Sequence, residues 1–518
     1  MPKSISIRRA VAVAPAAALA LLAIVSARSE QPGGTIGTAH HPIRTASAEA
    51  QEHFDRGMNL FYGFDRGGAR RSFLKAATAD PAAAMPLVGV ALASGPNLNS
   101  DPTPADIEAG CAAARKAKSL ARLVEETAYA DALAGRYCNG LTFDSATGYA
   151  IDLGGLFQRR PDDYDAAALY ADSLLSLRPR SAEQQAELVA VLEQALKRWP
   201  GHLGANHYYI HAVEGSRNPE RAMPSAQHLE SLVAPGGHLR HMPAHIYSRT
   251  GDYARAIQAN ERAVEADLAY TRANGDSDEQ RMYSHHNLES LAVAAGFAGR
   301  FAVAQRAGAA AASHGHFSPV LGFVLLRFAR WEEALRLPEP AGSAMPDPLW
   351  YRFTRAVAHA RLGQVAQAAA ERERFRQLAR GLSPGILYRQ NTATLVVDVL
   401  GAIADARIAA ARGEPAAAIE GWERAVRTQD LLEYHEPPAI YYPARESLGA
   451  ARFNARQFAQ AEAAFRDDLA RNPRNPRSLF GLAQTLAALG RRDEANAVRR
   501  QFETASAGSD VTLSLADY

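Results

Sequence analysis

The stretch Gly251-Asp252-Tyr253-Ala254-Arg255-Ala256 joins an apolar helical segment to an amphipathic one that ends near Asp267. Both segments carry the helical period, and the turn between them is very short. Gly and Ala recur in such turns because the two helices of a pair must approach each other closely. The pattern predicts an all-α fold built from repeated helix–turn–helix units. The same signature occurs at Leu362-Gly363 with Ala366, at Arg412-Gly413 with Ala416, at Leu489-Gly490 with Ala495, and in a first copy from Phe54 to Asp80-Pro81 with Ala69, Phe73 and Ala76.

These units resemble the tetratricopeptide-repeat (TPR) family, and the resemblance covers most of residues 47–506. It implies a solenoid of helix pairs with a period of roughly 34 residues. A coiled coil is excluded, because Gly and Pro interrupt the helical pattern too often. The units around 270–282 and 380–400 depart from the period. We expect residues 270–282 and 95–104 to form loops at the rim of the groove.

The N-terminal residues predict export. Lys3, Arg8 and Arg9 precede an apolar run from Ala10 to Val25, and small residues follow it, which is typical of a secretory signal peptide at residues 1–27. We expect a linker over 28–46 and a C-terminal tail over 507–518. The mature chain would then be periplasmic or secreted and have no membrane span, the alternative being an uncleaved membrane anchor.

Charge and cysteine content exclude several kinds of site. The chain has 57 Lys and Arg against 55 Asp and Glu, a net charge of +2, so no polybasic surface indicates nucleic-acid binding. Cys111 and Cys138 are too few for a thiolate metal site. They could pair in an oxidising compartment, but we expect them on adjacent helices at different heights, so their pairing stays open.

Seven of the 16 histidines lie between His202 and His245. His207, His211 and Glu214 share one helical face, because they are spaced by four and three residues. His238, His241 and His245 share a face for the same reason. Since 241 − 207 = 34 and 245 − 211 = 34, one repeat separates the two sets. We expect His207 to face His241, and His211 to face His245.

The TPR resemblance places these residues in the concave groove. It puts His238, His241 and His245 at groove-lining positions of their repeat, and His286 at the position of the next repeat that corresponds to His238. The histidine cluster at 202–290 therefore lies along one stretch of groove. His228, His314, His316 and His359 do not fall on this face.

Clustered imidazoles favour a transition metal, because packed neutral histidines without one lose solvation and repel one another on protonation. The predicted ligands are His207, His211, His238, His241, His245 and His286, with Glu214 as a ligand or a general base. Copper would support oxidative chemistry and zinc hydrolytic chemistry, so a metal-dependent oxidoreductase or hydrolase is possible. The alternative is a scaffold that binds a peptide, a protein or a small molecule in its groove without metal.

The amino-acid sequence around the cluster resembles that of a group of secreted bacterial TPR proteins with a His-rich groove motif. The resemblance implies a fold and motifs, but it implies no reaction. Asp65-Arg66 departs from the Asn-His that relatives often carry after Tyr-Gly-Phe. The matching stretches are residues 204–214, 237–247, His40-His41-Pro42-Ile43, Gly95-Pro96-Asn97, His286-Asn287, and Glu436-Pro437-Pro438 followed by Tyr441-Tyr442-Pro443.

Overall fold

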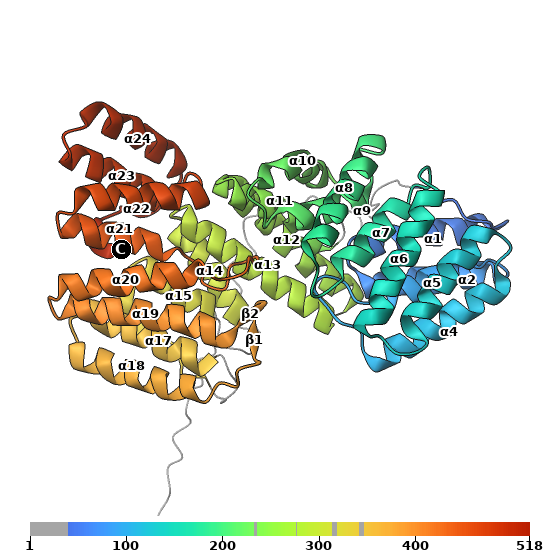
Figure 1. Ribbon diagram of the computed structural model, residues 1–518, viewed down its shortest axis with the longest axis horizontal. Helices are drawn as coiled ribbons and strands as arrows, with labels where there is room; N and C mark the ends of the chain where they lie inside the picture. Colours follow the sequence, from blue (N-terminus) through green and yellow to red (C-terminus); the bar gives the residue numbers. More distant parts are fainter. Residues whose placement is uncertain (1–39, 233–235, 276, 313–318, 341–346) are drawn as a thin grey trace, which may run out of the picture. The chain divides into compact units, whose positions relative to one another are not determined.

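The chain is a succession of α-helices in the computed structural model, which describes residues 40–232, 236–275, 277–312, 319–340 and 347–518 (Figure 1). These residues fall within one compact unit, Thr35–Tyr518. The predicted signal peptide, the linker up to residue 39, His314 and His316 lie outside the described residues. Within them the predicted all-α solenoid of TPR type is confirmed.

The described helices are α1 (Ala48–Tyr62), α2 (Arg66–Ala79), α3 (Met85–Ala93), α4 (Pro104–Leu120), α5 (Val124–Tyr137), α6 (Phe143–Arg159), α7 (Ala166–Leu175), α8 (Ala182–Arg198), α9 (Leu203–Val213), η3 (Pro219–Ala222), α10 (Met223–Ser231), α11 (Gly237–Arg249), α12 (Tyr253–Asn274), α13 (Asp278–Phe297), α14 (Phe301–Ala312), α15 (Pro319–Arg327), α16 (Trp331–Leu335), α17 (Asp347–Arg361), α18 (Val365–Arg380), α19 (Ala393–Ala411), α20 (Pro415–Gln429), α21 (Ala444–Asn454), α22 (Phe458–Arg471), α23 (Pro476–Ala488), α24 (Arg492–Ala505) and η4 (Leu515–Asp517).

One turn geometry recurs between the two helices of a pair. In the α11–α12 turn Gly251 has a φ of 76°, and the N–H of Asp252 donates to the carbonyl of Tyr247, five residues earlier, at 2.7 Å. This is the Schellman arrangement, whose left-handed residue strongly favours glycine. The Asp252 side chain then caps α12 by accepting from the N–H of Arg255. A left-handed residue, followed by a residue whose N–H donates to the carbonyl five residues earlier at 2.8–3.0 Å, also occurs at Phe64, Gly299, Ala329, Gly363, Gly413, Arg456 and Gly490.

Close helix contacts explain other glycines of the repeat. Gly57 of α1 and Gly89 of α3 both lie against the ring of Phe73 in α2, and a Cβ at either glycine would meet that ring at 2.4 Å. Phe73 therefore fills the space between two neighbouring first helices, and no larger residue fits opposite it. Gly449 and Gly481 pack against Phe465 of α22 in the same way.

The irregular segments agree with the sequence prediction only in part. Residues 94–103 form a loop between α3 and α4. Residues 270–282, which we expected to form a loop, are mainly helical, because α12 continues to Asn274 and Ser277 caps the start of α13. The departure at 380–400 contains a two-stranded hairpin, in which β1 (Leu387–Tyr388) pairs antiparallel with β2 (Asn391–Thr392).

Cys111 and Cys138 form a disulfide with Cα atoms 5.0 Å apart. The expectation that they lie at different heights was therefore wrong. Cys111 lies within α4, and Cys138 immediately follows α5. The offset between these two helices brings the cysteines level, which spacing along the sequence does not reveal.

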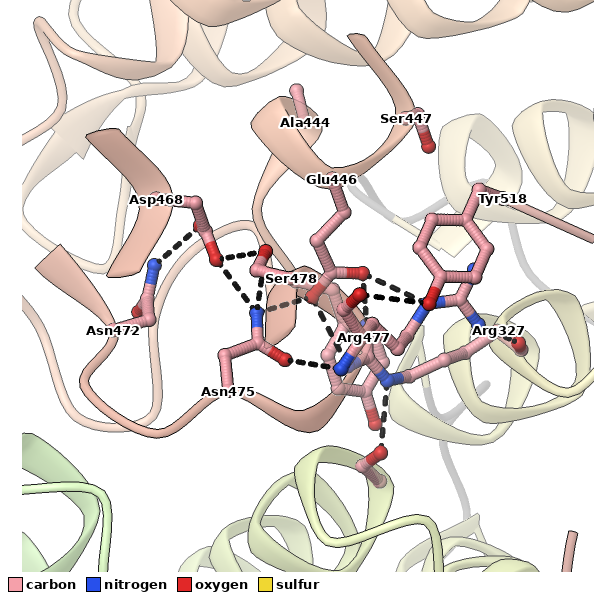
Figure 2. A network of polar contacts seen from close by, with 12 residues as sticks. Arg327, Ala444, Glu446, Ser447, Asp468, Asn472, Asn475, Arg477, Ser478 and Tyr518 are labelled. Atoms are coloured by element: carbon pink, nitrogen blue, oxygen red, sulfur yellow. Dashed lines mark hydrogen bonds and ion pairs between the residues drawn. The ribbon is translucent and has the colours of Figure 1, made fainter. Parts of the chain in front are cut away.

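Residues 507–518, expected as a C-terminal tail, pack back onto earlier helix pairs of the chain. Asp510 accepts hydrogen bonds from the N–H groups of Phe301 and Ala302 at 2.6 and 2.9 Å, and so caps α14. Figure 2 shows the end of this segment, where the ring of Tyr518 lies 3.9 Å from the guanidinium of Arg477. No helix among the described residues is long and apolar enough to cross a bilayer.

Two glycines test the turn assignment, because a methyl group added at either one meets nothing within 4 Å. Gly413→Ala places a side chain at a φ of 76° and should destabilise the α19–α20 pair by about 1 kcal/mol. Gly148→Ala, inside α6, should instead stabilise its helix by about 0.5–1 kcal/mol. Hydrogen exchange of these helices measures both effects. Equal effects of the two substitutions would contradict the assignment.

Candidate metal centre

Three neighbouring helices carry the six predicted ligands. His207 and His211 come from α9, His238, His241 and His245 from α11, and His286 from α13. The α9 and α11 imidazoles are almost fully buried, while the His286 side chain is 26% exposed. The first helices of three successive pairs therefore direct imidazoles toward one region, as the TPR resemblance implied.

A group of four potential ligands forms around His241. Its Nε2 lies 2.7 Å from Nε2 of His245, 3.0 Å from Nε2 of His286 and 3.3 Å from Oε2 of Glu436. All four atoms lie within 4.8 Å of one another. Ligands in a tetrahedron around zinc, with bonds of about 2.0–2.1 Å, are about 3.3 Å apart. The spacing of this group, which we call the four-ligand group, therefore fits one small ion.

Outer hydrogen bonds orient two of these rings. Nδ1 of His241 lies 2.6 Å from Oδ1 of Asn260, and Nδ1 of His245 contacts a carboxylate oxygen of Glu214. Because both oxygens accept, each Nδ1 carries the hydrogen. In the neutral rings the Nε2 atoms then point their lone pairs at each other and at Glu436. Metal-bound histidines in proteins are usually held in this way.

A second group, the three-histidine group, consists of His207, His211 and His238, whose candidate ligand atoms lie within 4.8 Å of one another. Nε2 of His207 is 3.0 Å from Nε2 of His238. The ring of Phe64, from the α1–α2 turn, packs against all three imidazoles at centroid distances of 4.5–5.9 Å. We expected His207 to face His241, but it faces His238 instead. The other expected pair is present, because the rings of His211 and His245 have centroids 5.3 Å apart.

Glu214 joins the two groups. One of its oxygens lies 3.0 Å from Nδ1 of His211, and the other contacts Nδ1 of His245. Burial alone would raise the pKa of Glu214, but these two imidazoles lower it to about 2. An ionised carboxylate that accepts from two ligand histidines is placed to orient them. Glu214 also forms, with His211 and His245, a third group of candidate ligand atoms within 4.8 Å of one another.

The charges of the site are unevenly distributed. Burial alone would lower the pKa of His245, but Glu214 and Glu436 raise it to about 9. Burial lowers the pKa of His286 to about 4, despite Glu436. Burial and then neighbouring imidazoles lower the pKa of His207 and of His238 well below 6.5. Most of these rings are therefore neutral near pH 7, while His245 is protonated on both nitrogens and carries a positive charge.

Glu436 is the ligand that the sequence prediction missed. It lies in residues 430–443, the loop between α20 and α21, and the three histidines lower its pKa well below 4.5 against the effect of burial. The only sequence signal was its place in the Glu436-Pro437-Pro438 motif, to which we assigned no role. Arg389 of the β-hairpin holds this loop, because it donates to the carbonyl of Pro437 at 2.6 Å and pairs with Glu289 at 2.6 Å.

The groove at this stretch is covered by the chain itself, which the sequence did not predict. Phe64 covers the three-histidine group, and the 430–443 loop brings Glu436 onto the other group. Tyr434 of the loop packs so closely on Gly215 that a Cβ there would meet its ring at 3.0 Å. The histidines expected to line an open concave surface are therefore buried.

Other histidines lie outside both groups. His41 contacts Asp165 at 2.8 Å and His40 contacts Asp55 at 2.9 Å. His359 is bonded to Gln364 at 2.6 Å, and His228 lies on α10. Arg66 donates to the carbonyls of Leu92 and Pro96 and so holds the 94–103 loop.

Comparisons with known proteins add no functional assignment. No family model matches the sequence, and no curated protein sequence matches it. Among solved structures, the chain is similar to a chain of the Cut9–Hcn1 hetero-tetramer of the APC/C, with 14% identity, 92% of this chain and 77% of that chain covered, and a TM-score of 0.29.

Two further solved structures give similar values. Yeast Tom70 shows 11% identity over 90% of this chain and 93% of its own, with a TM-score of 0.31. The human IFIT1 dimer with m7Gppp-AAAA shows 12% identity over 78% of this chain and 87% of its own, with a TM-score of 0.33. At these values the similarity carries no argument about the site, which rests on its own geometry.

Glu214→Gln tests the orienting role of Glu214. The amide has one oxygen, so its NH₂ group would face the N–H of either His211 or His245, and that ring would lose its orientation. We expect metal affinity to fall by about 10–100-fold, measured by competition with a chelator. Glu193→Gln is the control, because Glu193 of α8 accepts from Tyr209 of α9 and belongs to neither group. Unchanged affinity in Glu214→Gln would instead favour the general base.

Proposed function

We propose that this chain is an exported metalloprotein, in which the TPR solenoid holds a buried transition-metal ion in the four-ligand group. The ligands are His241, His245, His286 and Glu436. The ion gives the protein a Lewis-acid or redox centre, and with it a metal-dependent oxidative or hydrolytic activity. The Cys111–Cys138 disulfide supports the exported location, because such bonds persist in oxidising compartments. N-terminal sequencing, expected to begin near Arg28, tests the export.

The convergence of three imidazole nitrogens and one carboxylate oxygen, all within 4.8 Å of one another, carries this proposal, and the charge of the site supports it. Glu214 and Glu436 both have a lowered pKa and are ionised, whereas His245 supplies a single positive charge. A divalent ion in place of that proton balances both carboxylates. It would also lie between the converging Nε2 atoms of His241 and His286, which are 3.0 Å apart.

The donor set indicates which ions fit. Three imidazole nitrogens and one carboxylate oxygen suit zinc and copper. Thiolate is absent from the candidate site, because Cys111 and Cys138 are bonded to each other. Copper would bring one-electron chemistry, whereas zinc would polarise a bound water or carbonyl.

The alternative, a groove that binds a peptide without metal, is less favoured at this stretch of the solenoid. A peptide that lay against the histidines would have to displace Phe64, which is fully buried, and the loop that Arg389 holds. Burying two carboxylates with one imidazolium would also be costly if no cation were bound.

Matched variants of two glutamates in the same loop test the metal assignment. Glu436→Gln removes the ligand carboxylate while keeping its shape, and we expect elemental analysis of tag-free protein to show loss of bound metal. Glu433→Gln, at an exposed position three residues earlier, should keep the metal. His241→Ala should behave like Glu436→Gln, and His228→Ala like Glu433→Gln. Equal metal content in all four variants would sink the proposal.

A second test uses pH. The ion must displace the proton of His245, whose pKa is about 9 in the metal-free site. Because the metal-free state binds this proton and the metal-bound state does not, affinity should rise with pH, by about tenfold per unit between roughly pH 6 and 8. Calorimetry in buffers with different ionisation enthalpies should show the release of close to one proton for the ion that binds the four-ligand group. Affinity independent of pH would contradict this ligand set.

A further inference from the structure

We infer that the three-histidine group is a second metal site, with an open coordination position that faces a small-molecule cavity, so that this group binds the substrate. This inference rests on the proposed function, because it assigns the second site of the same centre. His207, His211 and His238 are the ligands. The substrate class is a small polar molecule, neutral or cationic, with hydrogen-bond donors.

The nitrogens of the group are prepared to bind an ion. Nδ1 of His207 donates to the carbonyl of Tyr62 at 2.6 Å, and Nδ1 of His211 donates to Glu214 at 3.0 Å. Each neutral ring therefore presents a bare Nε2. Nε2 of His211 is buried and has no partner among the described residues, although buried polar atoms normally have one. A metal ion that also binds His207 and His238 would satisfy it.

The number of protein ligands separates the two sites. The four-ligand group can enclose its ion with protein atoms alone, which is typical of closed sites, whereas three histidines leave one position for an exogenous ligand. Glu214 is close, but both of its oxygens are engaged by His211 and His245. Phe64 shields the three rings with an apolar surface, which strengthens electrostatic interactions with anything bound there.

A cavity of about 200 Å³ adjoins this group. His238 lies in its wall, and the ring of Tyr283, also in the wall, is 4.7 Å from the ring of His238. Asp65, Asp267 and Glu279 contribute carboxylates to the lining, against one arginine, Arg71. This lining attracts hydrogen-bond donors and repels anions, which sets the substrate class.

Cobalt titration of the metal-free mature protein tests the inference, with imidazole as a neutral probe ligand. We expect two Co²⁺ ions per chain and a change in the visible spectrum when imidazole binds. His207→Ala should bind one Co²⁺ and lose the imidazole response. Glu436→Gln should lose the other ion and keep the response. His228→Ala should match the unsubstituted protein.

Access through the cavity is tested at Gly236, which lines the cavity, has an extended backbone, and would place a Cβ in open space. Gly236→Phe should keep two ions but weaken imidazole binding at least tenfold, while Gly236→Ala should not. One ion per chain in the unsubstituted protein would overturn the second site and leave the proposed function intact. If the unsubstituted protein binds no ion, both the proposed function and the second site are overturned. If Gly236→Phe leaves the imidazole response unchanged, the cavity is not the route to the site.

Discussion

Imidazole lone pairs that point at one another in a buried site are tolerated only when a positive charge lies between them. Nε2 of His241 lies 2.7–3.0 Å from Nε2 of His245 and of His286, and all three nitrogens lie 3.0–3.5 Å from one carboxylate oxygen of Glu436. In the metal-free site the proton of His245 supplies positive charge at this point. Glu214 and Asn260 fix the outer nitrogens of two rings, so the rings cannot simply turn away. Helices α9, α11 and α13 and the 430–443 loop hold the side chains that surround this positive charge.

The solenoid is well suited to build such a site. Each Schellman turn, with its left-handed residue, returns the chain so that successive first helices lie side by side. Side chains one repeat apart then meet, and a concave surface forms that can be closed from elsewhere. Here two distant segments close it: Phe64 from the first pair, and the loop before α21, which the β-hairpin anchors through Arg389. A surface that would otherwise be open to a peptide becomes the interior of a site.

The sequence predicted the features that follow from the helical period and from the length of the repeat, namely the turns and the helical faces that carry the histidines. Gly251, Gly363, Gly413 and Gly490 marked turns whose left-handed residue favours glycine. The spacings of three, four and 34 residues related five of the histidines, and the TPR resemblance added His286. It could not predict contacts made by tertiary packing. Glu436 is 195 residues beyond His241 (436 − 241 = 195), in a loop without a period, and the helix offset that joins Cys111 to Cys138 leaves no trace in their spacing. The predicted partner of His207 was wrong as well, because its Nε2 lies 3.0 Å from Nε2 of His238.

X-ray absorption spectroscopy at the edge of the bound metal tests the central claim most directly, because it reports the ligand atoms themselves. The account predicts a shell of nitrogen and oxygen at about 2.0–2.1 Å for zinc, with multiple scattering from three imidazoles per ion. Three imidazoles per ion are expected if one ion occupies the four-ligand group. The same average is expected if two ions occupy both groups, because each group contains three histidines. A shell made of oxygen alone, or of sulfur, or with fewer than two imidazoles per ion, would contradict it.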